Sequence, residues 1–371
     1  MDVLSRAHAL ERAGRRVVHM EIGEPDFTAP EPVVEAGVRA LREGRTAYTA
    51  TLGLPQLREE IAAHYARRFA LRVPAERVVV TSGASGGLLT VAALYIDAGD
   101  EVLVPDPGYP GYRHFVRAFE GRARALPVSA AESFQPTVAM VRAAWTPRTK
   151  ALILGSPSNP TGTLIERKEL AAIAAFIAER GGVLIVDEIY QGLSYGAEPS
   201  SAFGLPGNVV IVNSFSKYFC MTGWRLGWAV LPSSAVRGFE KLAQHLFISA
   251  PAAAQYAACA AFSPESIRVL EERRAQFARR RDFLLPVLKQ AGLQVPAEPH
   301  GAFYVYADCA GDARRYCLEL LEKEGVAATP GVDFGANGTD RCVRFAYTRS
   351  MSDLEEAAWG IRRFAASWLS A

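Results

Sequence analysis

The sequence predicts an α/β protein of two domains, and three observations carry that prediction. The chain has 371 residues, which exceeds one typical hydrophobic core. Short runs rich in Val, Ile and Leu alternate with helical patterns through the middle of the chain. After about residue 265 this alternation gives way to a long helical stretch with fewer strands. We therefore expect a large domain at 31–265 and a smaller α+β domain formed by 1–30 and 266–371.

The large domain is predicted to hold a mainly parallel sheet sandwiched by helices. Its apolar runs are continuous rather than alternating, as in strands that are buried on both faces. Because these runs alternate with helical patterns, right-handed crossovers should place helices on both sides of the sheet. The strands are expected at 77–81, 101–104, 151–154, 183–186, 209–212 and 224–231.

The smaller domain is predicted from a different pattern. Its elements are expected at 265–290, a long helix rich in Arg and Glu, and then at 303–307, 313–324, 326–329, 342–347 and from 351 onward. Prolines near residues 25–32 form a stiff connector, so we expect the first 30 residues to join this domain. The arginines of the long helix are expected on a solvated face, namely Arg273, Arg274, Arg279, Arg280 and Arg281.

The composition argues against several classes of function. The formal net charge is +2 at pH 7, and no long basic run marks a face that binds nucleic acid. No apolar stretch is long enough to cross a membrane, and residues 1–16 lack the apolar block of a signal peptide. The five cysteines form no CxxC pair, which argues against a disulfide framework or a zinc site. We therefore expect a cytoplasmic protein without a bound metal.

Two loops at the carboxyl ends of predicted strands are candidate ligand-binding segments, because open α/β sheets bind ligands at this edge. Residues 81–87 read Thr-Ser-Gly-Ala-Ser-Gly-Gly and lead into a helix. Backbone N–H groups there would suit a phosphate, and a plain glycine-rich turn has the same pattern. Residues 156–162 read Ser-Pro-Ser-Asn-Pro-Thr-Gly, which suits a rigid turn, but the Asn159 amide can donate to a ring oxygen.

The third motif is Asp-Glu-Ile-Tyr at 187–190, directly after a predicted buried strand. A carboxylate at this position is costly unless a cation pairs with it, and a protonated pyridine nitrogen would be such a partner. Tyr190 can share the same face and donate to a phenolic oxygen. The competing interpretation is that Asp187 caps the following helix.

The fourth motif, at 213–228, is the most specific. Lys217 lies among apolar and small residues just past a strand, where burial lowers the pKa of an amine and frees it to attack a carbonyl. A lysine in a surface loop is the alternative. Arg225 follows closely and suits a phosphate group. A lysine, phosphate donors and a paired acid together indicate pyridoxal phosphate chemistry.

From about Gly23 to the C-terminus the sequence resembles the class I/II aminotransferases of fold type I, the aspartate aminotransferase superfamily. The matching motifs follow the family's order, at 23–27, Tyr48, 53–55, 158–162, 187–190, 216–217, 223–228 and 344–345. The resemblance implies an aminotransferase (transaminase) that uses pyridoxal 5'-phosphate to move an amino group between an α-amino acid and a 2-keto acid. It also implies a seven-stranded, mainly parallel sheet and a homodimer with shared active sites.

The resemblance assigns a role to each matching residue. Lys217 would carry the cofactor as a Schiff base and then act as general base at the substrate Cα. Asp187 would keep the pyridine nitrogen protonated, and Arg344 would bind the substrate carboxylate beside Asn159 and the backbone of Gly23. The remaining cofactor contacts would be Asn159 and Tyr190 at the phenolate oxygen, Tyr109 stacked on the ring, Ala84, Ser85, Ser214 and Arg225 at the phosphate, and Tyr48 at the phosphate of the neighbouring subunit.

One departure from the family bears on the substrate. Relatives specific for dicarboxylates carry an arginine from the partner subunit for the distal carboxylate, but residues 244–249 contain none and offer only His245. We therefore expect a wide or apolar side-chain pocket. Two alternative functions stay open: a β-eliminating lyase or decarboxylase on the same scaffold, and a non-catalytic regulator that binds pyridoxal phosphate. The intact set of Lys217, Asp187 and Arg344 argues against the regulator.

Overall fold

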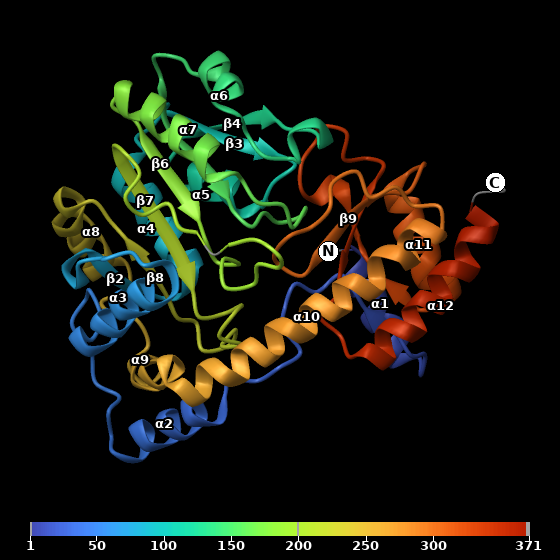
Figure 1. Cartoon of the computed structure of the whole chain (residues 1–371), viewed down its shortest axis with the longest axis horizontal. Coiled ribbons are helices and arrows are strands. Elements are labelled where there is room, and N and C mark those ends of the chain that lie inside the picture. Colours follow the sequence, from blue (N-terminus) through green and yellow to red (C-terminus); the bar gives the residue numbers. More distant parts are fainter. Residues whose placement is uncertain (1, 199, 369–371) are drawn as a thin grey trace.

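The computed structural model describes residues 2–198 and 200–368 and shows a large sheet-containing lobe beside a smaller one (Figure 1). The α-helices are α1 (Asp2–Arg12), α2 (Glu31–Arg42), α3 (Pro55–Phe69), α4 (Gly83–Tyr95), α5 (Gly111–Ala118), α6 (Val138–Ala144), α7 (Arg167–Glu179), α8 (Ser233–Leu246), α9 (Ala252–Cys259), α10 (Pro264–Gln290), α11 (Ala313–Glu324) and α12 (Met351–Trp368). The strands are β1 (Val18–His19), β2 (Val78–Thr81), β3 (Glu101–Asp106), β4 (Arg122–Pro127), β5 (Thr149–Gly155), β6 (Val183–Asp187), β7 (Asn208–Ser214), β8 (Gly227–Val230), β9 (Tyr304–Asp308), β10 (Val326–Ala327), β11 (Thr329–Pro330) and β12 (Cys342–Ala346).

The large lobe is built on a seven-stranded sheet with the order β2-β8-β7-β6-β5-β3-β4. Strands β4, β3, β5, β6 and β7 pair in parallel, whereas β8 is antiparallel to both β2 and β7. No helix intervenes between β7 and β8, so the chain returns in the opposite direction. The predicted mainly parallel, seven-stranded sheet is confirmed.

Helices bury this sheet on both faces, which explains the continuous apolar runs. Along β5, Leu152 and Leu154 join the core that includes α3 and α7, whereas Ala151 and Ile153 join the core that includes α4, α5 and α8. The carboxyl ends of the parallel strands therefore stay uncovered by this packing, and their loops are free to build a site.

Several strands differ from the sequence expectation, and the two-residue strand β1 was not predicted. β4 was not predicted, because it is an exposed edge strand whose residues are mostly polar or small. The strand expected at 224–231 begins only at Gly227, since Arg225 adopts a left-handed backbone conformation with φ of 53°. The single strand expected at 326–329 is two strands, β10 and β11, which belong to different sheets.

The smaller lobe joins the two ends of the chain. Its antiparallel sheet has the order β11-β12-β9, and β1 pairs in parallel with β10, with Val18 opposite Val326. Helix α10 runs between the lobes and contacts α2, α12 and β9 (Figure 1). No helix in the described part of the chain is long and apolar enough to cross a membrane.

The arginine-rich face of α10 is not wholly solvated, so that expectation is wrong for Arg280. Its side chain is buried and donates to both carboxylate oxygens of Asp26, each at 2.8 Å. Arg273 donates to the Thr28 carbonyl, whereas Arg279 is exposed. The cause is tertiary, because the segment around Asp26 folds back over this face of the helix.

Candidate active site

A cavity of about 540 Å³ lies at the carboxyl ends of the parallel strands and is closed on one side by residues of the smaller lobe. Eleven predicted site residues line it, namely Gly23, Ala84, Ser85, Tyr109, Asn159, Asp187, Tyr190, Ser214, Lys217, Arg225 and Arg344. Tyr48 does not line it and is 78% exposed. The structure therefore gathers all of the predicted residues except the one expected to act on a neighbouring subunit.

Lys217 projects into this cavity from the loop after β7. Its Nζ donates to the carbonyl oxygen of Gly23 at 2.6 Å. Burial lowers the pKa of this amine to about 8, Glu24 opposes that shift, and Arg344 and Arg225 add to it. About a tenth of the amine is therefore uncharged at pH 7 and can act as a nucleophile or base.

Asp187 lies at the end of β6, buried at the floor of the cavity. Its Oδ2 accepts a hydrogen bond from the Tyr112 hydroxyl at 2.8 Å, and its Oδ1 accepts from the Ile189 N–H at 3.2 Å. Burial raises the pKa of Asp187 to about 6, and these two donors oppose that rise. Among the described residues no cation forms an ion pair with this carboxylate, so a cationic ligand would relieve its desolvation.

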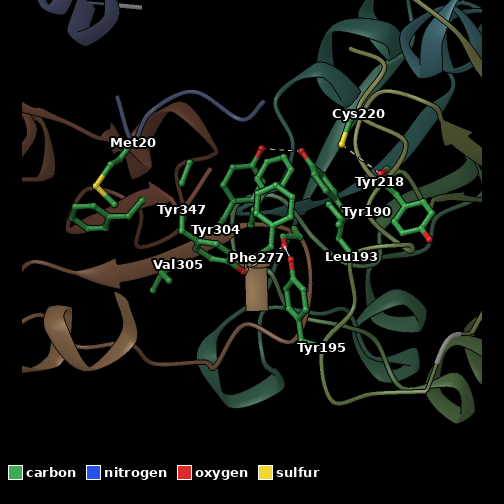
Figure 2. Close-up of a cluster of buried hydrophobic side chains, with 14 of the residues drawn as sticks. Met20, Tyr190, Leu193, Tyr195, Tyr218, Cys220, Phe277, Tyr304, Val305 and Tyr347 are labelled. Carbon is green, nitrogen blue, oxygen red and sulfur yellow. Dashed lines mark hydrogen bonds between the residues drawn. The ribbon is translucent and has the colours of Figure 1, made fainter. Parts of the chain in front are cut away.

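Tyr190 meets Tyr304 of the smaller lobe, and their hydroxyl oxygens lie 2.8 Å apart (Figure 2). Burial raises the pKa of both phenols, so each stays a neutral donor. The same Tyr304 hydroxyl lies so close to Gly23 that a Cβ at residue 23 would collide with it. The Tyr190–Tyr304 hydrogen bond thus joins the smaller lobe to the strand ends of the larger one.

Arg344, on β12, is buried at the other wall of the cavity. Its guanidinium donates to Asn159 Oδ1 at 3.0 Å, to the Glu21 carbonyl at 2.6 Å and to Thr329 Oγ1 at 3.3 Å. None of these acceptor groups is negatively charged, and within residues 2–198 and 200–368 the buried Nε has no hydrogen-bond partner. A buried guanidinium held this way is suited to bind a carboxylate.

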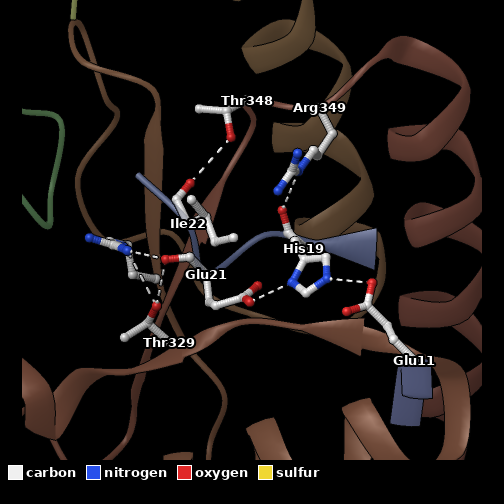
Figure 3. A network of polar contacts seen from close by, with 8 residues as sticks. Glu11, His19, Glu21, Ile22, Thr329, Thr348 and Arg349 are labelled. Atoms are coloured by element: carbon white, nitrogen blue, oxygen red, sulfur yellow. Dashed lines mark hydrogen bonds and ion pairs between the residues drawn. The ribbon is translucent and has the colours of Figure 1, made fainter. Parts of the chain in front are cut away.

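A network of charged and polar groups surrounds His19 (Figure 3). His19 contacts Glu21 through Nδ1 at 2.7 Å and Glu11 through Nε2 at 3.0 Å, and Arg349 donates to the His19 carbonyl. Because the Glu21 carbonyl accepts from Arg344, the network holds the backbone that orients the guanidinium. It links α1 to the cavity wall.

The opposite end of the cavity is suited to an anion. Helix α4 begins there without a side-chain cap, so its first N–H groups, which have no helical partners, are not satisfied by a capping side chain. Gly83 has φ of 72°, and a Cβ there would lie 2.6 Å from Arg225 Nη2. Glycine thus lets the guanidinium approach the start of the helix, where Ala84 and Ser85 also line the cavity.

Sequence reasoning missed two tyrosines that contact the predicted residues. Tyr112 lies in α5, three residues after Tyr109, which precedes that helix, and their rings pack edge to face at 5.3 Å. Its closeness along the chain to Tyr109 was the only local signal for it. Tyr304 begins a strand of the smaller lobe, and nothing in its local sequence indicates that it reaches Tyr190.

Comparisons with known proteins agree with this geometry. The profile of the family described as "Aminotransferase class I and II" matches residues 15–361. The valine–pyruvate aminotransferase of Mycobacterium tuberculosis is 40% identical over 374 residues, which cover 100% of this chain and 95% of that protein. The (5-formylfuran-3-yl)methyl phosphate transaminase of Methanocaldococcus jannaschii is 39% identical, over 98% of this chain and 95% of that protein.

A solved structure shares the complete fold. The crystal structure of an aminotransferase from Mycobacterium tuberculosis superimposes with a TM-score of 0.96 at 39% identity, covering 99% of this chain and 96% of that one. The sequence similarity and the shared architecture thus extend over both lobes and every segment that lines the cavity.

Proposed function

The chain belongs to the class I and II aminotransferase family, and on that premise we propose that it carries out amino transfer between an α-amino acid and a 2-keto acid at the cavity around Lys217. It is an aminotransferase that depends on pyridoxal phosphate. The family match and the names of its relatives favour this prediction over the lyase, decarboxylase and regulator alternatives.

The residues present fit the cofactor at three chemically different points. An amine with a lowered pKa suits its aldehyde, a buried carboxylate suits its ring nitrogen, and the start of α4 with Arg225 suits its phosphate. When bound, pyridoxal phosphate supplies an aldehyde that takes up amino groups and a protonated ring that withdraws electrons from the bonds at the substrate Cα.

In this proposal Lys217 has two successive tasks. Its amine would hold the cofactor through the aldehyde and would be free once a substrate amine is held there instead. The freed amine then moves a proton to and from the substrate Cα, for which a pKa of about 8 is well matched to neutral pH. The Gly23 carbonyl, 2.6 Å from Nζ, keeps the amine at the cavity wall between these steps.

Three other residues position the reacting groups. Asp187 would keep the ring nitrogen protonated. The hydrogen bond from Tyr112 would assist, because it stabilises the Asp187 carboxylate. Arg344 binds the α-carboxylate and so fixes Cα within reach of Lys217. Asn159 and Tyr190, which both line the cavity, would donate to the ring oxygen.

The observation that carries the proposal is the meeting of Lys217, Asp187 and Arg344 in one cavity, although they lie on three different elements. The test is an amino-acid panel with pyruvate or 2-oxoglutarate as acceptor, followed by cofactor absorbance. Turnover should require an acceptor and be lost in Lys217→Ala. Release of pyruvate and ammonia without an acceptor would instead indicate elimination.

Borohydride reduction should fix the cofactor to Lys217, and labelling of another lysine would overturn its assignment.

We further propose that the protein is a homodimer whose active sites are shared. Supporting this, Tyr48 is 78% exposed, and Leu41, Leu246 and Ile248 are also exposed apolar side chains of the larger lobe. If Tyr48 serves the neighbouring site, mixing Tyr48→Ala and Lys217→Ala chains should give more activity than the two separate preparations. Activity equal to their sum would refute sharing.

The domain division and the cellular location are also proposals. The pairing of β1 with β10 supports joining residues 1–30 to 266–371, with 31–265 as the large domain. Limited proteolysis between these parts would test the division. The five cysteines are all free, which supports a cytoplasmic location. Fractionation of cells that produce the protein would test it.

A further inference from the structure

A second cavity, of about 440 Å³, adjoins the first and lies between α1 and α11. Its volume is within the range of about 300–1,000 Å³ typical of small-molecule sites. The two cavities share four lining residues: Ile22, Tyr109, Asn159 and Arg344. The second cavity is therefore continuous with the proposed reaction site.

Arg344 separates the two cavities. Its guanidinium carbon lies 4.3 Å from the centre of the Tyr304 ring and 4.8 Å from the centre of the Phe334 ring. Tyr304 lines only the first cavity and Phe334 only the second. A carboxylate bound to Arg344 would thus place the attached carbon at the boundary between them.

The second cavity has apolar walls. Val3 and Leu4 of α1 face Leu318 of α11, with Pro330 and Phe334 beside them. Leu318 is 39% exposed although it is a large apolar side chain, as expected of a wall that a ligand covers. Apolar walls next to a single buried cation match an amphiphilic ligand with one carboxylate.

The other charges of the second cavity do not favour a second carboxylate. Among its described lining residues, Glu21 and Asp333 are acidic, and Arg314 is basic but exposed. Glu21 already pairs with His19, so neither it nor the exposed, water-screened Arg314 would attract a distal carboxylate. Aspartate and glutamate side chains are therefore poor matches for this space.

From these observations we propose that the second cavity binds the substrate side chain and selects α-amino acids with large, uncharged apolar side chains. This rests on the proposed function, because it requires the α-carboxylate on Arg344 and the α-amino group directed toward Lys217. Of the three non-hydrogen groups on Cα, only the side chain is then left to enter the second cavity. Each methylene group held there changes the rate ratio by about 10- to 200-fold.

The experiment measures single-turnover amino transfer to the cofactor-loaded full chain from alanine, leucine, phenylalanine and aspartate. Leucine and phenylalanine should exceed aspartate by at least about tenfold. Leu318→Trp should fill the cavity and slow leucine and phenylalanine at least about tenfold, with alanine changed less than about twofold. Met351→Trp is the matched control, since Met351 is 38% exposed, lines neither cavity and should leave all four rates unchanged.

Leu318→Arg provides a second variant and should shift preference from leucine toward aspartate. Aspartate faster than leucine in the unaltered enzyme would overturn the inference, as would an equal loss for alanine in Leu318→Trp. Those results would leave the proposed function intact, because alanine would still be converted. Failure of the unaltered enzyme to convert any amino acid would instead defeat the proposed function.

Discussion

The Tyr112 hydroxyl donates a hydrogen bond to Asp187 Oδ2 at 2.8 Å, inside the cavity and 75 residues away along the chain. This bond lowers the pKa of Asp187 against the larger, opposing effect of burial. It therefore favours the ionised carboxylate that a protonated pyridine nitrogen needs as its partner.

Tyr112→Phe should raise the pKa of Asp187 and weaken cofactor binding. The loss of a hydrogen bond to a charged group is worth about 1.5–3 kcal/mol, so the dissociation constant should rise about 10- to 100-fold at pH 7. Absorbance titration of the apoenzyme with pyridoxal phosphate would measure this. Tyr316→Phe is the control, because Tyr316 is a buried tyrosine whose hydroxyl has no hydrogen-bond partner among the described residues. An unchanged affinity in Tyr112→Phe would contradict the role of the bond.

Capture of the cofactor by the apoenzyme should accelerate as the pH rises from 7 to 9. The Lys217 amine is charged below its lowered pKa of about 8, and only the uncharged form attacks an aldehyde. The rate at pH 7 should thus be about a tenth of its plateau. Stopped-flow absorbance would follow the reaction, and an apparent pKa near the ordinary lysine value of 10.5 would be inconsistent with burial of this amine.

Arg344→Lys should lower kcat/KM for α-amino acids about 10- to 100-fold, because an ammonium group cannot replace the two-pronged donor that a carboxylate requires. Because lysine keeps the positive charge, the fall in kcat/KM would measure the contribution of the guanidinium geometry. Reaction of the bound cofactor with a simple alkylamine, which has no carboxylate, is the internal control and should keep its rate. A parallel loss with the alkylamine would mean that the variant disturbs the whole site.

The His19 network should make folding stability depend on pH. The hydrogen bond to Glu21 raises the pKa of His19, burial opposes this, and the Glu11 contact adds to the rise. Stability from a raised histidine pKa is present below the unfolded value of 6.5 and is lost as the pH rises through the folded value. The difference in unfolding free energy between the unaltered chain and His19→Gln should therefore be larger at pH 6 than at pH 9. Denaturant titrations at both pH values would show a constant difference if the network were unimportant.

Arg280→Ala should destabilise the fold by at least about 3 kcal/mol, since it leaves Asp26 without its partner in a largely buried pair. Arg279→Ala, one position earlier on the same helix and exposed, should change stability by less than about 0.5 kcal/mol. Urea unfolding of both variants measures the contrast. Equal effects would show that the pair contributes no more than the loss of one surface arginine.

The amino-acid sequence by itself determined the sheet and the main contents of the cavity. Buried parallel strands need continuous apolar runs, and their carboxyl ends must meet at one edge, so Asp187 and Lys217 could be brought together from the strand pattern. The order of the motifs, which resembles that of the aminotransferase family, then implied the cofactor and identified Arg344 as a further site residue. β4 could not be predicted from apolar runs, because an exposed edge strand needs none.

Tertiary structure alone decided the contacts between segments that are distant along the chain. The Tyr190–Tyr304 pair spans 114 positions, and the burial of Arg280 depends on Asp26, 254 positions away. Neither contact produces a periodic pattern in the local sequence, since each depends on how one lobe packs against another segment. The same is true of Arg344, whose place between two aromatic rings divides one cavity from the next and suggests which substrates the enzyme accepts.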